Sequence, residues 1–224
     1  NETVFFRKSF RIAAVWTLVM ALLEIMQGHM NATVLQNEQP TKLAAMESHW
    51  ETTSKAPLYL LSWPDQENSR NVFELLPIPG MLSLLAGHST DTAVKGLNEF
   101  PASERPPVLP DFLSFRAMVG FGFLFLLVGI IVFWKRNQIE EYPLLLRLLP
   151  WMIPLPYIAN QLGWTIAEIG RQPWIVYGMM KTSDAVSKIE TSQVAVSLIA
   201  FFLVYLLLGL VDFYLLFKIA RKGP

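Results

Sequence analysis

Charged and sulfur-bearing side chains that could do redox or proton chemistry lie in or beside apolar segments of this 224-residue chain. Glu168 closes one apolar run and is followed by the polar sequence Gly-Arg-Gln-Pro-Trp, residues 170–174. Arg116 and Met118 lie within another run. A thioether is a soft iron ligand, and a carboxylate can ligate iron or carry protons. Because charge near a bilayer is costly, these residues indicate a partner or a function.

Each of these side chains also has an ordinary explanation. Met118 could fill a core or face lipid, as most methionines in apolar helices do. Arg116 could extend its charged head to the membrane interface. Glu168 could pair with Arg171. The three histidines are not spaced as a metal-ligand set. The residues alone leave these alternatives open.

Four apolar runs must position these residues, and each is long enough to cross a bilayer as a helix of about 20 residues. They cover residues 9–28, 112–134, 146–169 and 193–217. The third contains Pro150, Pro154 and Pro156 in its first turns, where we expect a kink. Hydrophobic residues make up 53% of the chain and charged residues 16%, against about 25% charged in soluble domains. The sequence therefore predicts an all-α, polytopic transmembrane helix bundle with about four spanning helices.

The positions of lysine and arginine predict how the chain crosses the membrane. Clusters at residues 7–11, 135–136 and 218–222 fall on one side of an alternating topology, which is then the cytoplasmic side. The predicted regions are a first spanning helix (1–29), an outer-side loop region (30–111) and a region of three spanning helices (112–224). Within the loop, residues 39–52 have helical spacing of Leu43, Met46 and Trp50. The net charge of zero gives no indication of a nucleic-acid partner, and the absence of cysteine excludes disulfides and thiolate metal sites.

Three motifs, taken together, resemble subunit I of the cytochrome bd quinol oxidases. They are TKLAAMESHWET at residues 41–52, SFRAMVGFG at 114–122 and GWTIAEIGRQPW at 163–174. They occur in the family's order on a compatible topology. The resemblance covers the second half of the family's subunit and essentially all of this chain, in the form with a short Q-loop, the outer-side quinol-binding loop.

The resemblance implies roles for four residues in catalysis and metal binding. Lys42 and Glu47 match the pair implicated in quinol binding and oxidation. Met118 matches the axial iron ligand of the low-spin haem b. Glu168 matches the carboxylate at the iron of the high-spin haem b and is expected to take part in catalysis.

Five further residues are expected beside the haems. Arg116 matches a basic residue near the low-spin haem, and Trp164 matches an aromatic residue next to the haem cluster. Arg171, Gln172 and Trp174 are expected to hold the outer ends of the helices and the haem propionates.

The activity implied is quinol oxidation coupled to reduction of O₂ to water through low-spin haem b, high-spin haem b and haem d. It generates a proton-motive force without a pump, in the bilayer of a bacterial or archaeal cytoplasmic membrane. The expected partners are the N-terminal half of subunit I, subunit II and small single-helix subunits.

The resemblance implies that the histidine ligands are supplied by the N-terminal half of the subunit, and no histidine lies within a predicted spanning core of this chain. The chain begins with Asn1, which suggests a piece of a longer chain or one half of a split protein. Two other functions stay open, a transporter or channel and a haem-free structural membrane subunit.

Overall fold

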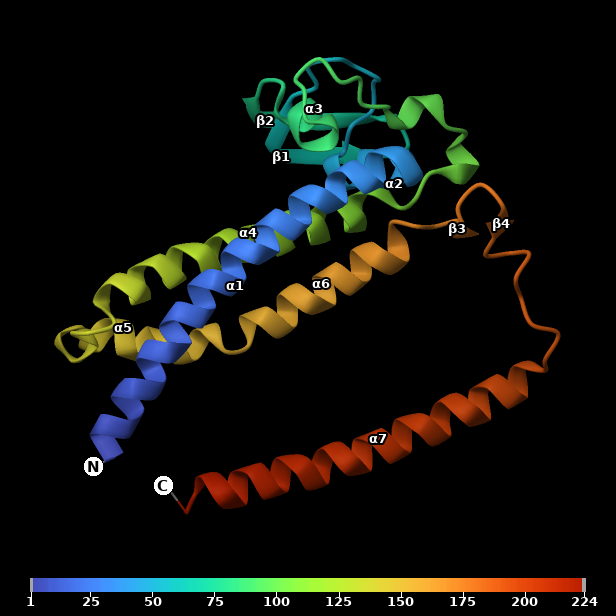
Figure 1. Ribbon diagram of the computed structural model, residues 1–224. Coiled ribbons are helices and arrows are strands. Elements are labelled where there is room, and N and C mark those ends of the chain that lie inside the picture. The colour runs from blue at the N-terminus through green and yellow to red at the C-terminus, as the bar shows by residue number, and fades with distance from the viewer. Residues whose placement is uncertain (1, 223–224) are drawn as a thin grey trace. The chain divides into compact units, whose positions relative to one another are not determined.

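Residues 2–222 are described by a computed structural model, and the chain divides into two compact units after Asp184. In the first unit, helix α4 (Val108–Lys135) packs against α1 (Glu2–Glu38) and α6 (Leu155–Ile169) (Figure 1). Glycine allows these close contacts. A Cβ atom added to Gly129 of α4 would lie 3.4 Å from the Cα atom of Leu18 in α1.

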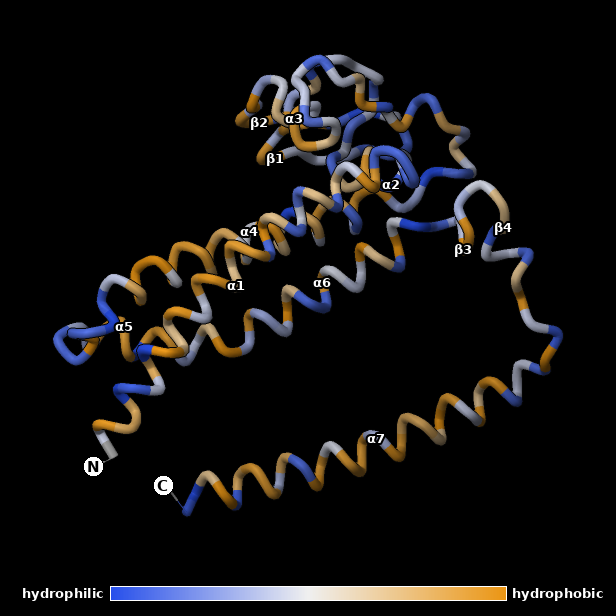
Figure 2. Tube along the Cα trace, viewed as in Figure 1, coloured by the Kyte–Doolittle hydropathy of each residue, from blue (hydrophilic) through white to orange (hydrophobic). Residues whose placement is uncertain are grey.

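Three helices are long and apolar enough to cross a membrane: residues Thr3–Glu38 of α1, α4, and α7 (Thr191–Ala220). α7 forms most of the second unit and buries none of its residues within the chain. Apolar residues follow one another along α4 and α7 (Figure 2). The apolar surfaces of α4 and α7 are suited to contact with lipid or with other membrane helices. All three helices extend beyond the predicted apolar runs, because polar residues continue the same hydrogen-bonding pattern outside the bilayer core.

The third predicted span, residues 146–169, is not a single helix. It is divided into α5 (Pro143–Leu148), the 3₁₀ turn η4 (Leu149–Met152) and α6. Proline lacks the backbone N–H and clashes with the preceding turn, so Pro150 and Pro154 interrupt the helix. α6 has 15 residues and is about 22 Å long, less than the apolar thickness of a bilayer. α5, η4 and α6 follow one another as a kinked helical segment, so about four spanning segments stays a prediction; three helices among the described residues are long enough to span by themselves.

The segment between α1 and α4 is a folded region, and it corrects the prediction of an all-α fold. It begins with α2 (Pro40–Glu47), as the spacing predicted, although Trp50 follows the end of this helix. Strands β1 (Leu58–Asp65) and β2 (Arg70–Ile78) form an antiparallel hairpin, followed by α3 (Met81–Gly87). Aliphatic and aromatic residues on both sides of a polar turn favour such a hairpin.

Short elements complete the first unit. The 3₁₀ turns η1 (Leu97–Glu99) and η2 (Ala102–Glu104) precede α4, and η3 (Ile139–Glu141) follows it. After α6, β3 (Trp174–Val176) and β4 (Met180–Lys181) form a second two-stranded sheet. The fold is mostly helical, with two small sheets.

The buried core lies around α2 and not along the long helices. Leu43 of α2 packs in one cluster with residues of β1, α3 and the loops beside them. Ala44 and Ala45 pack in a second cluster with Trp50, Leu97 and Val108. α2 is therefore packed between two apolar clusters, and this packing fixes the positions of its remaining side chains.

Candidate functional site

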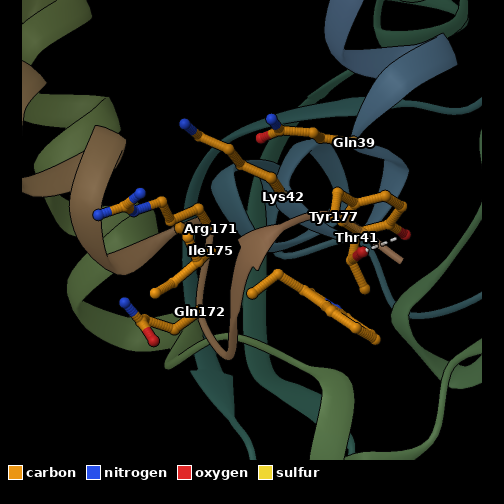
Figure 3. A pocket seen from close by; sticks show the side chains of 9 residues that line it. Gln39, Thr41, Lys42, Arg171, Gln172, Ile175 and Tyr177 are labelled. Carbon is orange, nitrogen blue, oxygen red and sulfur yellow. Dashed lines mark hydrogen bonds between the residues drawn. The ribbon is translucent and has the colours of Figure 1, made fainter. Parts of the chain in front are cut away.

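A small cavity lies where α2 meets the segment that follows α6. Its volume is about 30 Å³, enough for a water molecule or one polar group. In Figure 3, Lys42 and Arg171 extend away from the hydrogen bond between Thr41 and Tyr177. In that bond the Thr41 hydroxyl donates to Tyr177 Oη over 2.7 Å. The lining residues come from two short stretches: Gln39, Thr41, Lys42, Gly170, Arg171, Gln172, Trp174, Ile175 and Tyr177.

Lys42 is the half-buried cation on the α2 side of this cavity. Within residues 2–222 its ammonium group has no hydrogen-bond or ion-pair partner in the protein. Burial lowers the pKa of Lys42, the Asp111 carboxylate opposes this shift, and the Arg171 guanidinium adds to it. The side chain thus offers unused donors to a ligand.

Glu47 does not line the cavity, although it lies on the same short helix. Its carboxylate accepts a hydrogen bond from Arg116 Nη2 of α4 over 2.5 Å, and the two side chains are only 5% and 16% exposed. Burial raises the pKa of Glu47, and Arg116 acts against that shift. The Arg116 guanidinium also lies 5.2 Å from the centre of the Phe112 ring. The structure therefore separates Lys42 from Glu47 and links Glu47 to the helix that carries Met118.

Met118 lies on the side of α4 that faces α6. A Cβ atom on Gly163 would lie 3.2 Å from the Met118 sulfur. One on Gly170 would lie 2.7 Å and 2.9 Å from the two carboxylate oxygens of Asp111. These two contacts show that α4 and α6 run antiparallel. Glu168 then lies about 7 Å from Met118 along the helix axes.

The polar sequence after α6 is held by local contacts. Glu168 accepts a hydrogen bond from Arg171 Nη2 over 2.5 Å, the pairing that the sequence left open as an ordinary explanation. The Gln172 amide donates to the Glu168 backbone carbonyl over 3.3 Å, and its carbonyl accepts from the Thr182 hydroxyl over 2.8 Å. Both Glu168 and Arg171 are about 40% exposed, so both can still meet a partner.

The two tryptophans named by the sequence occupy different environments. Trp164 of α6 is 65% exposed. Trp174 begins β3, lines the cavity and has the Lys181 ammonium 5.1 Å from the centre of its ring. An exposed aromatic ring on a membrane helix is suited to contact with lipid, a cofactor or another helix.

Sequence reasoning missed Asp111, Tyr177 and Thr41. The acidic Asp111 stands at the start of an apolar run, where an acid in the first turn of a helix is ordinary. Nothing local distinguishes Tyr177 or Thr41, because their contact joins residues 136 positions apart. His29 and His88 do come together, with ring centres 4.9 Å apart. No third ligand joins them within residues 2–222.

The donor atoms fit part of a haem-binding site. Met118 offers a thioether and Glu168 a carboxylate, the latter half exposed. Arg116 and Arg171 each keep a buried Nε that has no hydrogen-bond partner in the described part of the chain. Guanidinium groups of this kind pair well with propionate carboxylates. Each haem would need at least one further ligand from another chain or segment.

Comparisons with known proteins point to a single family. The family profile described as cytochrome bd terminal oxidase subunit I matches residues 1–224. The cytochrome bd-II ubiquinol oxidase subunit 1 of Escherichia coli is 31% identical over 285 residues, covering 97% of this chain and 55% of that protein. The cytochrome bd ubiquinol oxidase subunit 1 of Bacillus subtilis is 34% identical over 236 residues, covering 100% of this chain and 50% of that protein.

A solved structure agrees with these relatives. The structure of bd oxidase from Geobacillus thermodenitrificans matches with a TM-score of 0.85 and 32% identity, over 100% of this chain and 51% of that one. The chain thus spans about half the length of the curated relatives it matches. Because the profile covers every residue and the solved structure has the same fold, the chain belongs to the cytochrome bd terminal oxidase subunit I family.

Proposed function

We propose that this chain is the quinol-binding and partly haem-binding portion of a membrane-bound quinol oxidase that reduces O₂ to water. The observation that carries the proposal is the connection between α2 and α4. α2 places Lys42 at a cavity and, through Glu47 and Arg116, is joined directly to α4, two residues before Met118. A substrate site and a candidate iron ligand are therefore linked by one buried ion pair.

Low-spin haem b, high-spin haem b and haem d, when bound, would supply the one-electron transfer and the O₂ chemistry. Met118 would hold the first and Glu168 the second. Arg116, Arg171 and Gln172 would meet propionates, and Trp164 and Trp174 would pack beside the macrocycles. The remaining histidine ligands would come from the N-terminal half of subunit I, in a complex with subunit II and small single-helix subunits.

The protein's own residues would bind the substrate and accept its protons. The Lys42 ammonium would donate a hydrogen bond to a quinol oxygen that enters the cavity. The Glu47 carboxylate would accept a proton close to that site, and its raised pKa suits a group that exchanges protons. Proton release on the outer side would generate a proton-motive force without a pump.

A haem spectrum of the purified complex, measured together with quinol oxidation, tests this function. We expect reduced b-type and d-type bands and O₂ consumption that depends on added quinol. A complex without haem would support the structural-subunit alternative. A complex with haem that does not oxidise quinol would contradict the substrate assignment alone.

The proposed topology predicts which lysines are reached from outside the cell. Lys55 and Lys188 should react with a membrane-impermeant amine reagent added to intact cells, whereas Lys135 and Lys222 should react only after the membrane is opened. The reason is the alternating placement of the basic clusters. Peptide mass spectrometry would read the modification, and labelling of Lys135 in intact cells would contradict the topology.

A further inference from the structure

Asp111 is a buried acid to which no role has yet been given. It lies in the first turn of α4 and is 0% exposed. Neither carboxylate oxygen has a hydrogen-bond partner in the protein among residues 2–222. Burying a charge without a partner costs several kcal/mol or more, so a position of this kind requires an explanation.

The surroundings of Asp111 make an isolated negative charge still less favourable. Its carboxylate packs on Gly170, the residue that ends α6 and whose N–H donates to the Ile166 carbonyl over 3.0 Å. The C-terminal end of a helix carries partial negative charge. The first turn of α4 opposes this effect. Burial nevertheless raises the pKa of Asp111 to about 7, and the Lys42 ammonium acts against that shift, so Asp111 relies on Lys42 to remain ionised near neutral pH. Substituting Gly170 would itself disturb this packing, since a Cβ there would lie within 3 Å of both oxygens.

Gly170 forms part of the cavity wall, with Lys42 and Arg171 beside it. Arg171 is already paired with Glu168 over 2.5 Å. Lys42 has no such partner within residues 2–222. Asp111 contacts Gly170, and Lys42 lines the same cavity as Gly170; neither side chain has an ion-pair partner among residues 2–222.

Glu47, the acid of α2, is not available as a partner for Lys42. Glu47 is committed to Arg116 in a buried pair and does not line the cavity. The charged and titratable groups that face Lys42 are Asp111 from α4, Glu168 and Arg171 from the end of α6, and Tyr177 from the β3–β4 turn. Of these, Asp111 is the acid with no cation of its own.

We propose that Asp111 is a positioning residue of the substrate site, whose carboxylate keeps Lys42 protonated as a hydrogen-bond donor toward a substrate oxygen. The identity of that substrate as a quinol rests on the proposed function. The electrostatics agree, because Asp111 is the largest influence that raises the pKa of Lys42 against the lowering caused by burial. Without Asp111, burial and Arg171 would lower the pKa of Lys42 further, so less of the amine would be a charged donor.

The test measures the reactivity of Lys42 in the complete, detergent-solubilised complex. A small acylating reagent would be applied over a range of pH, and the modified peptides quantified by mass spectrometry. Only the neutral amine reacts, so the profile reports the pKa of Lys42. Asp111→Asn should shift the Lys42 profile to lower pH and raise its acylation rate by about tenfold or more below the wild-type midpoint. The exposed Lys55, acylated in the same sample, is the internal reference and should not change.

Two further readouts separate this role from a general structural one. Asp111→Asn should raise the KM for quinol more than it lowers kcat, with unchanged haem bands. Asp65→Asn, which removes an acid from the hairpin, should leave the Lys42 profile as in the wild type. If the asparagine variant does not assemble, the smaller Asp111→Ser removes the same charge.

An unchanged Lys42 profile in an assembled Asp111 variant would overturn the proposal. So would a Lys42 that is acylated at no pH, because the cavity would then not present the amine. The labelling needs no turnover. A complex that shows the shift but does not oxidise quinol therefore contradicts the proposed function and leaves the role of Asp111 supported.

Discussion

Met118→Leu is expected to abolish the low-spin haem b signal in the reduced spectrum and, with it, quinol oxidation. Leucine is close to methionine in volume but has no electron pair to donate to iron. The haem would lose its sixth ligand and become high-spin, or be lost. Any haem that stays should have a lower reduction potential, since thioether ligation raises it. Optical spectra, potentiometry and quinol-dependent O₂ consumption of the purified complex measure these effects.

Met46 provides a matched control for this substitution. It is a buried methionine of α2, only 6% exposed, with no proposed ligand role. Met46→Leu should cost less than about 1.5 kcal/mol and leave every haem band in place. An unaltered low-spin band in Met118→Leu would show that the ligand assignment is wrong. Loss of the band in both variants would indicate a general packing defect.

Glu47→Ala is expected to destabilise the complex strongly as well as stop quinol oxidation. The substitution leaves the Arg116 guanidinium, 16% exposed, without its carboxylate partner. Removing one member of a buried ion pair costs about 3–5 kcal/mol. Lys42→Ala should also stop quinol oxidation, but with little loss of stability, because Lys42 is half-buried and has no ion pair within residues 2–222. Thermal unfolding and quinol oxidation, measured on both variants, separate these effects.

The double variant Glu47→Met, Arg116→Met is the control for the ion pair. Replacing both charges by apolar groups of similar size can be nearly neutral for stability. The double variant should therefore unfold at a higher temperature than Glu47→Ala while remaining inactive. Equal unfolding temperatures for Lys42→Ala and Glu47→Ala would contradict the structural importance of the pair. Normal quinol oxidation in both single variants would contradict a role of either residue in substrate oxidation.

Lys42 and Glu47 have different structural roles. The sequence motif had implied a single shared role for both, in quinol binding and oxidation. In the structure Lys42 faces a cavity, whereas Glu47 ties α2 to α4 near Met118. Substitutions at the two positions can reduce the same activity for different physical reasons. Stability measurements are therefore as informative here as rates.

Local sequence patterns correctly predicted the spanning length of three helices, the position of α2 and the family. Hydropathy over about 20 residues is a local property, and so is helical spacing. The motifs that carry the resemblance are contiguous as well. Each of these features can be read without knowing which segments pack together. The break within the predicted span at residues 146–169 agrees with the kink expected there, because Pro150 and Pro154 cannot donate the backbone hydrogen bonds of a continuous helix.

The contacts between polar groups depend on how distant segments pack, so they became visible only in the folded chain. The Glu47–Arg116 pair joins residues 69 positions apart, and the Thr41–Tyr177 hydrogen bond joins residues 136 apart. Asp111 lies against Gly170 because α4 and α6 pack antiparallel, and no local pattern fixes that register. The partner of a charged side chain depends on how helices approach one another, since burial and distance set the electrostatic energy and both arise only when the chain has folded.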